Sequence, residues 1–160
     1  MVRLSLFEAC HQQLDQLFFS NGWSLNYLEG QNCLELFLYF ELDNPLQLNF
    51  EDASQADSCQ DPLPYCLKVA IYSKYQPVSQ NLYWVALEID PNKGIEHGEL
   101  KAFLKTVKDQ SKSLSLAWKD WYQSDRSFEF DFAWDWKAYR DKIALYQETG
   151  RYDNRRLFLL

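Results

Sequence analysis

Hydrophobic residues recur along the chain at two spacings, and these spacings predict its helices and strands. Residues 5–20 follow the i, i+3, i+4 spacing of an amphipathic helix. The same face carries His11, which we therefore expect to be a core histidine. Ser5 and Glu8 have the spacing of a capping box, and the Asn-Gly pair at 21–22 is a natural helix stop.

Apolar residues then alternate with polar ones, which predicts strands. Residues 23–29 and 33–42 flank a short turn and are expected to form a hairpin. Residues 46–50 predict a short third strand. Residues 65–73 and 82–90 predict two more, which we expect to pair as an antiparallel hairpin because a short polar segment joins them.

Helical spacing returns from about Glu96. Leu100, Phe103, Leu104 and Val107 share one face, and the pattern continues to Trp121. An interrupting polar stretch predicts either one kinked helix or two short ones. A last helical pattern begins at Lys137 and is expected to stop at Gly150.

Between these helices lies the most regular pattern in the chain. Aromatic residues fill every second position from 128 to 136, and Glu129, Asp131 and Asp135 fill most of the gaps. This alternation predicts a strand with a buried aromatic face and an acidic solvent face. The alternative hypothesis is a carboxylate-dependent hydrolase or a metal-binding enzyme that uses these three acids. No second acidic motif accompanies them.

The order of elements predicts the fold class. Strands grouped in one part of the chain and helices in another indicate an α+β fold. We expect an antiparallel sheet of about five to six strands, with an N-terminal helix and C-terminal helices packed on one face. A length of 160 residues suits a single domain over residues 1–160.

Charge is distributed unevenly along the chain. Residues 1–96 hold 4 bases and 13 acids, residues 97–136 hold 6 and 7, and residues 137–160 hold 6 and 3, which together give the net charge of −7. An acidic body argues against a general nucleic-acid binder, which normally carries a basic surface. It predicts instead a protein partner with a basic surface.

Two segments are candidates for contact with a partner. Residues 51–64 form an acidic loop, and residues 151–160 combine arginines with an apolar end that predicts either a docking tail or an edge strand. The candidate partner-binding residues are Arg151, Arg155, Arg156, Leu157, Phe158, Glu51, Asp52, Asp57 and Asp61.

The sequence lacks the motifs of several kinds of catalytic and ligand-binding site. The four cysteines have no metal-ligand or redox spacing, only two histidines are present, and no glycine-rich phosphate loop occurs. We therefore expect no catalytic residues, no metal and no cofactor. No apolar run is long enough to span a membrane and the N-terminus does not read as a signal peptide, so the expected location is the cytoplasm.

These observations favour a non-catalytic interaction protein, a small accessory subunit or assembly factor of a larger complex. Six tryptophans and ten tyrosines exceed the needs of a small core, and exposed aromatics often dominate protein interfaces. A second hypothesis is an RNA-contacting small subunit of a nucleoprotein complex, such as one for RNA-guided defence. In that case only the C-terminal arginines would touch nucleic acid.

Overall fold

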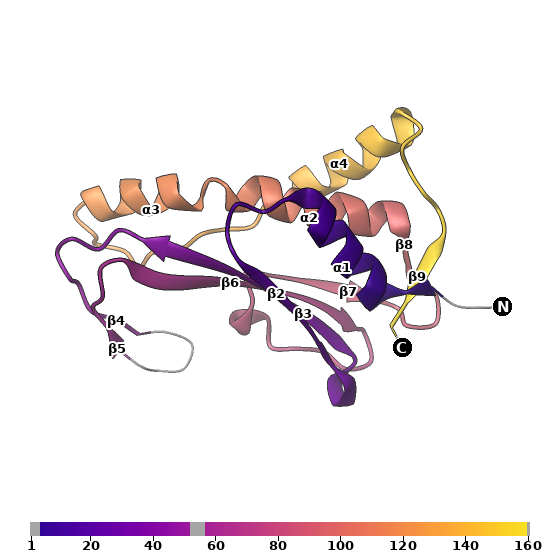
Figure 1. Cartoon of the computed structure of the whole chain (residues 1–160), viewed down its shortest axis with the longest axis horizontal. Helices are drawn as coiled ribbons and strands as arrows, with labels where there is room; N and C mark the ends of the chain where they lie inside the picture. Colours follow the sequence, from indigo (N-terminus) through magenta and orange to yellow (C-terminus); the bar gives the residue numbers. More distant parts are fainter. Residues whose placement is uncertain (1–3, 52–56, 160) are drawn as a thin grey trace.

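A mixed four-stranded sheet is the base of the fold, and helices cover one of its faces (Figure 1). The computed structural model describes residues 4–51 and 57–159. The sheet has the order β2 (Trp23–Leu28), β3 (Cys33–Leu42), β6 (Leu63–Ser73) and β7 (Val85–Ile89). A three-stranded sheet has the order β1 (Leu4–Ser5), β9 (Arg156–Phe158) and β8 (Ile95–Glu96), and β4 (Phe50–Glu51) pairs with β5 (Asp57–Ser58).

Helices lie over the main sheet in two layers. The helices are α1 (Leu6–Leu17), α2 (His97–Ser111), α3 (Leu114–Gln123) and α4 (Trp136–Glu148), with short 3-10 turns η1 (Glu29–Gln31) and η2 (Gln80–Leu82). Helices α1, α2 and α3 stand over the sheet, and α4 packs on α2 (Figure 1). The α+β class is therefore confirmed, whereas the main sheet is mixed and has four strands instead of the predicted five to six antiparallel ones.

The core lies between α2 and the inner face of the sheet. Leu100, Phe103, Leu104 and Val107 of α2 are almost completely buried, as their helical spacing predicted. They meet a layer of strand residues that share the inner face, namely Leu34, Leu36, Leu38, Leu67, Val69 and Ile71. Burial of this apolar area supplies most of the favourable free energy of folding.

The pairing of β6 with β7 differs from the prediction. The two strands run parallel, with Val69 opposite Val85 and Ser73 opposite Ile89, so the predicted antiparallel hairpin is wrong. Residues 74–84 carry the chain back to the middle of β6, so that β7 begins opposite Val69 and runs in the same direction, as a parallel pair requires. Val78 and Tyr83 of this connection pack against the outer face of the sheet. Alternation identifies a strand, but it carries no information on strand direction.

Two predicted boundaries also change. Helix α1 begins at the predicted cap, where the Ser5 side chain accepts a hydrogen bond from the Glu8 amide at 3.4 Å. It ends at Leu17, before the Asn-Gly pair, because Phe18 already adopts a left-handed conformation with φ of 50°. Of residues 46–50, only Phe50 enters a strand. The long helical pattern forms two helices, α2 and α3, which is one of the two alternatives predicted for it.

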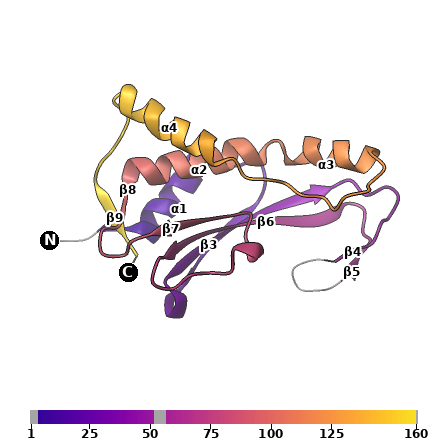
Figure 2. The same ribbon diagram turned by 180° about the vertical axis from the view of Figure 1, so that it is seen from behind.

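Residues 128–135, which we call the aromatic strap, connect α3 to α4 as an extended segment that runs below the helices (Figure 2). The strap pairs with no strand among the described residues, so the predicted strand is wrong. Its two faces nevertheless follow the predicted alternation. Phe130, Phe132 and Trp134 are half-buried, whereas Glu129 and Asp131 are exposed. The alternating pattern indicates an extended chain with one apolar face. A β-strand also needs backbone hydrogen bonds to a neighbouring strand, which the pattern does not indicate.

The C-terminal segment forms the middle strand of the small sheet. Strand β9 pairs in parallel with β1 and antiparallel with β8, and Leu157 lies opposite both Leu4 and Ile95. Leu157 is 1% exposed and therefore belongs to the core. The first and last described strands thus lie side by side in one sheet (Figure 1).

We expect the substitution Gly98→Ala to lower the free energy of unfolding by about 1–3 kcal/mol, as overpacking typically does. A Cβ atom at this buried position would lie 2.4 Å from Cδ2 of the Tyr152 ring. Gly30→Ala is the matched control, because a methyl group added there would have no heavy atom within 4 Å. Urea unfolding of both variants measures the difference, and equal stabilities would contradict the packing argument.

Candidate functional site

The predicted partner-binding residues lie at opposite ends of the molecule (Figure 1). The described residues of the acidic loop lie at the end of the molecule that also carries α3, and the arginines follow α4 at the opposite end, where Arg155 bonds the start of α2. Asp52 is outside the described residues, and Glu51 and Asp57 are described only by their backbone in β4 and β5. Asp61 is exposed, and its carboxylate accepts a hydrogen bond from the Asn44 amide at 3.0 Å.

The C-terminal arginines are exposed, but two of them pair with acids of the same chain. Arg155 donates to the Asp153 carboxylate through Nε and Nη2, with a shortest distance of 2.6 Å. Arg156 donates to the Lys93 carbonyl and lies 3.8 Å from the Glu96 carboxylate. Arg151 is exposed at the end of α4, and Phe158 is half-buried. Much of the positive charge that could contact phosphate is therefore balanced within the chain.

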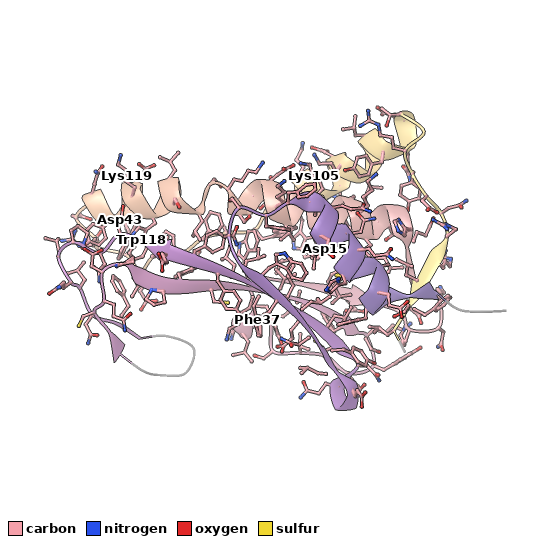
Figure 3. The ribbon with its side chains drawn as sticks, in the orientation of Figure 1. Asp15, Phe37, Asp43, Lys105, Trp118 and Lys119 are labelled. Atoms are coloured by element: carbon pink, nitrogen blue, oxygen red, sulfur yellow. The ribbon has the colours of Figure 1, made fainter. Side chains whose placement is uncertain are left out.

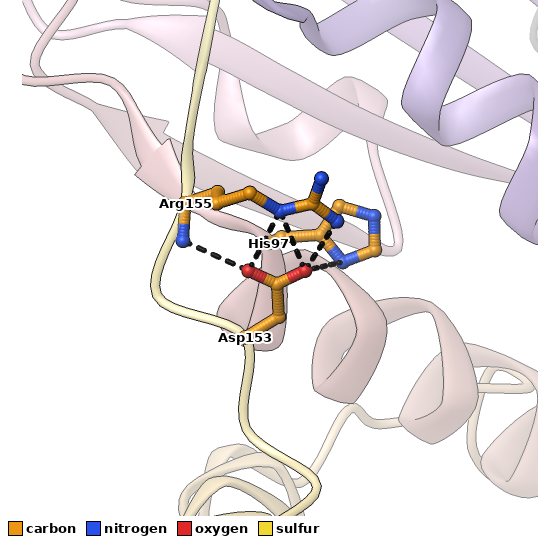
Figure 4. A network of polar contacts seen from close by, with 3 residues as sticks. All are labelled: His97, Asp153 and Arg155. Carbon is orange, nitrogen blue, oxygen red and sulfur yellow. Dashed lines mark hydrogen bonds and ion pairs between the residues drawn. The ribbon is translucent and has the colours of Figure 1, made fainter.

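Asp153 is the centre of this network (Figure 4). Besides Arg155, its carboxylate lies 4.0 Å from Nδ1 of His97, at the first residue of α2. Hydrogen bonds from the Arg155 side chain and amide hold the pKa of the Asp153 carboxyl at about 2. Two backbone hydrogen bonds also link the segments: the His97 amide donates to the Arg155 carbonyl, and the Gly98 amide donates to the Asp153 carbonyl. The cluster thus attaches the C-terminal segment to the start of α2.

The first turn of α2 adds one half-buried acid to this region. Burial raises the pKa of Glu99, whose charge in turn contributes to the raised pKa values of Tyr139 and Tyr152. Desolvation is the larger cause for both tyrosines, and it brings the pKa of Tyr152 to about 12. These hydroxyls therefore stay protonated at neutral pH, and none is activated as a base.

His11 occupies a different position from the one predicted. It is exposed, its Nδ1 lies 3.3 Å from the Asp15 carboxylate, and its ring meets Trp23 edge-on at 5.4 Å. The prediction of a core histidine is wrong, because His11 lies at the rim of the helix's apolar face. No nucleophile is seen in contact with either histidine among the described residues.

The three acids of the strap do not form a cluster. Glu129 and Asp131 face solvent, whereas Asp135 caps α4 by accepting a hydrogen bond from the Lys137 amide at 2.9 Å. Across residues 4–51 and 57–159, no three His, Cys, Asp or Glu side chains gather closely enough to hold a metal ion. The structure therefore offers no geometric support for the metal hypothesis.

We define the acidic end as residues 41–51, 57–64 and 114–131, which lie at one end of the molecule (Figure 3). These residues hold nine acids and two bases, a net charge of −7, so the rest of the 160-residue chain sums to zero. Hydrogen bonds tie the segments together. The Trp118 indole donates to the Asp43 carbonyl at 2.8 Å, and the Tyr122 hydroxyl donates to the Asn44 side chain at 2.9 Å.

Aromatic rings fill the interior of the acidic end. Trp118 contacts Phe50, Trp121 and Phe130 with ring centroids 5.0–5.3 Å apart, and Phe130 also meets Tyr65 at 6.1 Å. Three large apolar side chains at the same end face solvent, with exposed fractions of 60% or more: Leu46, Leu116 and Phe128.

Sequence reasoning missed these exposed residues for identifiable reasons. Phe128 has the same phase as the packed aromatics of the strap, so the alternation gives no sign of its exposure. Leu116 does depart from the face defined by Leu114 and Trp118, and that departure was a usable signal.

Two buried indoles have no hydrogen-bond partner among the described residues. The Nε1 atoms of Trp84 and Trp134 are both buried, and the two rings meet edge-on at 5.0 Å. A buried N–H without an acceptor costs about 1–3 kcal/mol. The aromatic side chains at this end of the strap are thus held by ring contacts, including the stacking of Phe132 on Trp84 at 5.4 Å.

Two hollows on the described surface lie away from the exposed apolar residues of the acidic end. One, with a volume of about 350 Å³, is bordered by Gln31, Val78 and Leu82. The other, of about 300 Å³, lies between α2 and α4 beside Asp109 and Lys142, which form an ion pair at 3.3 Å. Neither contains a pairing of nucleophile and base.

Comparison with known proteins relates the whole architecture to one family. Residues 1–157 match the family model described as "Protein of unknown function (DUF3013)". The chain belongs to the DUF3013 family. No curated protein matches the chain at a significant level. None of the helices described for this DUF3013 chain combines the length and apolarity needed to cross a bilayer.

A solved structure shows the same fold. The crystal structure of a conserved protein of unknown function from Enterococcus faecalis superposes with a TM-score of 0.80 and 14% sequence identity. The alignment covers 98% of this DUF3013 chain and 97% of that one. At this identity the similarity establishes the fold alone.

We expect the acid sensitivity of folding to depend in part on Asp153. An unfolded aspartate has a pKa of about 3.9, so a native pKa of about 2 stabilises the fold above pH 3.9. That contribution is lost as the pH falls towards 2. Because the carboxylate is partly exposed, its size is about 1 kcal/mol or less.

Urea unfolding at several pH values tests this expectation. Asp153→Asn and Arg155→Gln should each be less stable than the parent protein at pH 6 and should lose less stability between pH 5 and pH 2. The same slope in all three proteins would rule out the Asp153–Arg155 contact as the cause.

We expect Trp118 and Trp134 to respond differently to replacement by phenylalanine. Trp118→Phe deletes the hydrogen bond to the Asp43 carbonyl, whereas Trp134→Phe removes an unpaired N–H. The loss of unfolding free energy should be larger for Trp118→Phe by about 1 kcal/mol or more. Thermal unfolding of both variants measures this, and an equal or reversed order would contradict it.

Proposed function

We propose that this protein is a non-catalytic interaction module whose acidic end binds a basic segment of a partner protein. The observation that carries the proposal is that the acidic end holds a net charge equal to that of the whole chain and also exposes Leu46, Leu116 and Phe128. Opposite charge steers association and selects the partner, while buried apolar anchors supply affinity.

The opposite end of the molecule has the character of a structural element. There Arg155 and Arg156 pair with Asp153 and Glu96, and Leu157 is buried. Phosphate contacts would have to compete with these internal pairs. The arrangement therefore supports a protein partner more than an RNA partner.

We expect the full chain to bind a labelled lysine-rich peptide with aromatic anchors, and to bind it more weakly as salt is raised, because exposed charges are screened. The triple variant Glu41→Gln, Glu129→Gln, Asp131→Asn should weaken binding about three- to tenfold. Fluorescence anisotropy measures both effects.

A matched triple variant controls for net charge alone. Glu8→Gln, Glu29→Gln and Glu148→Gln neutralise three exposed acids that lie outside the acidic end. Binding should stay within about twofold of that of the parent protein. Equal weakening by both triple variants, or an affinity that does not change with salt, would refute the proposal.

A further inference from the structure

The aromatic strap has the sequence of a strand but lacks a partner strand. Its exposures alternate without exception from Glu129 to Asp135, with odd positions exposed and even positions half-buried. Such alternation is the mark of a half-buried strand. Each of the other long alternating segments, β2, β3 and β6, pairs with a neighbour over at least part of its length.

The main chain of the strap has unused hydrogen-bonding groups. At its ends, the Trp121 indole donates to the Phe128 carbonyl at 2.7 Å, and the Gln110 side chain bonds both backbone groups of Asp135. Among the described residues, no backbone group from 129 to 134 makes a hydrogen bond. The strap is thus anchored at both ends and along its aromatic face, while its backbone is unpaired. Backbone groups in this state are a template for another extended chain.

The main sheet is incomplete beside the strap. Strand β7 pairs only with Val69–Ser73, so residues 63–68 of β6 have a strand on one side alone. The strap passes this half of β6, because Phe130 meets Tyr65 and Phe132 stacks on Trp84, whose amide donates to the Lys68 carbonyl. The half of β6 that the strap passes therefore also has an edge without a strand partner among the described residues.

We propose that the partner binds as an extended strand that pairs with the backbone of the aromatic strap, and this inference rests on the proposed function. The occupant is a segment of another protein in which basic residues alternate with apolar ones. Its basic side chains would lie beside Glu129 and Asp131 on the exposed face, where opposite charges on neighbouring strands attract. A second copy of this chain is disfavoured, because two straps would place these acids against each other.

The mode of binding explains why the strap is acidic and aromatic at once. The rings of Phe130, Phe132 and Trp134 keep the strap extended before the partner arrives, which lowers the entropic cost of binding. The main-chain hydrogen bonds supply affinity, and the acids select a basic sequence. This is recognition by strand addition.

The test uses the full chain and three forms of a short peptide in which lysine alternates with valine. One form is unmodified, and the other two carry N-methyl groups on the odd or on the even amides. An added strand bonds through one edge, so one methylated peptide should bind about tenfold or more weakly while the other keeps its affinity. Backbone amide exchange should show every second amide of residues 129–134 protected by the unmodified peptide.

Other outcomes overturn the inference in separable ways. If both methylated peptides bind the acidic end as well as the parent peptide does, the proposed function stands and strand addition is wrong. Protection of the Cys66 amide without protection of the strap would assign the added strand to β6 instead. Protection of the strap without peptide, rising with protein concentration, would make the occupant a second copy. Failure of all three peptides to bind would refute strand addition, and failure of the lysine-rich peptide with aromatic anchors as well would refute the proposed function.

Discussion

Burial of the apolar face of α2 against the sheet is the constraint on which the other contacts depend. This helix meets the sheet below, α1 on one side and α4 above, and Phe103 is fully buried at the centre of these contacts. The C-terminal segment then attaches to its first turn through Asp153, and Gly98 is required there because Tyr152 occupies the space of a side chain. A change in side-chain volume along α2 would therefore disturb the packing of every layer of the fold.

The charged residues at the two ends of the molecule differ in whether they are paired with opposite charges. Near the chain termini, acids and bases pair with each other and hold the small sheet to α2. At the acidic end, nine acids face only two bases, and apolar side chains stand exposed beside them. Internal pairing stabilises a fold, whereas an unbalanced and partly apolar surface suits association with an oppositely charged partner. This contrast is why the acidic end carries the proposed function.

The aromatic strap contributes both to the core and to the charge of the acidic end. Its rings complete the aromatic interior between α3 and the sheet, and its acids contribute to the charge of the acidic end. Its unpaired backbone departs from the near-complete pairing of main-chain groups that is usual inside folded proteins, although solvent can satisfy an exposed edge. A binding partner that pairs with this edge would use a segment whose conformation the core has already fixed.

The sequence by itself determined those features that depend on neighbouring residues in the chain. Helical spacing located α2 and its buried face, the Ser5 cap placed the start of α1, and alternation identified both the β2–β3 hairpin and the inward-facing rings of the strap. Only the tertiary structure decided what depends on distant partners: the parallel direction of β7, the exposure of His11, the pairing of Arg156 with Glu96, and the absence, among the described residues, of a strand beside residues 129–134. The physical reason is that periodicity records which side of a segment is apolar, whereas hydrogen-bond ladders and ion pairs require a second segment whose position the local sequence does not encode.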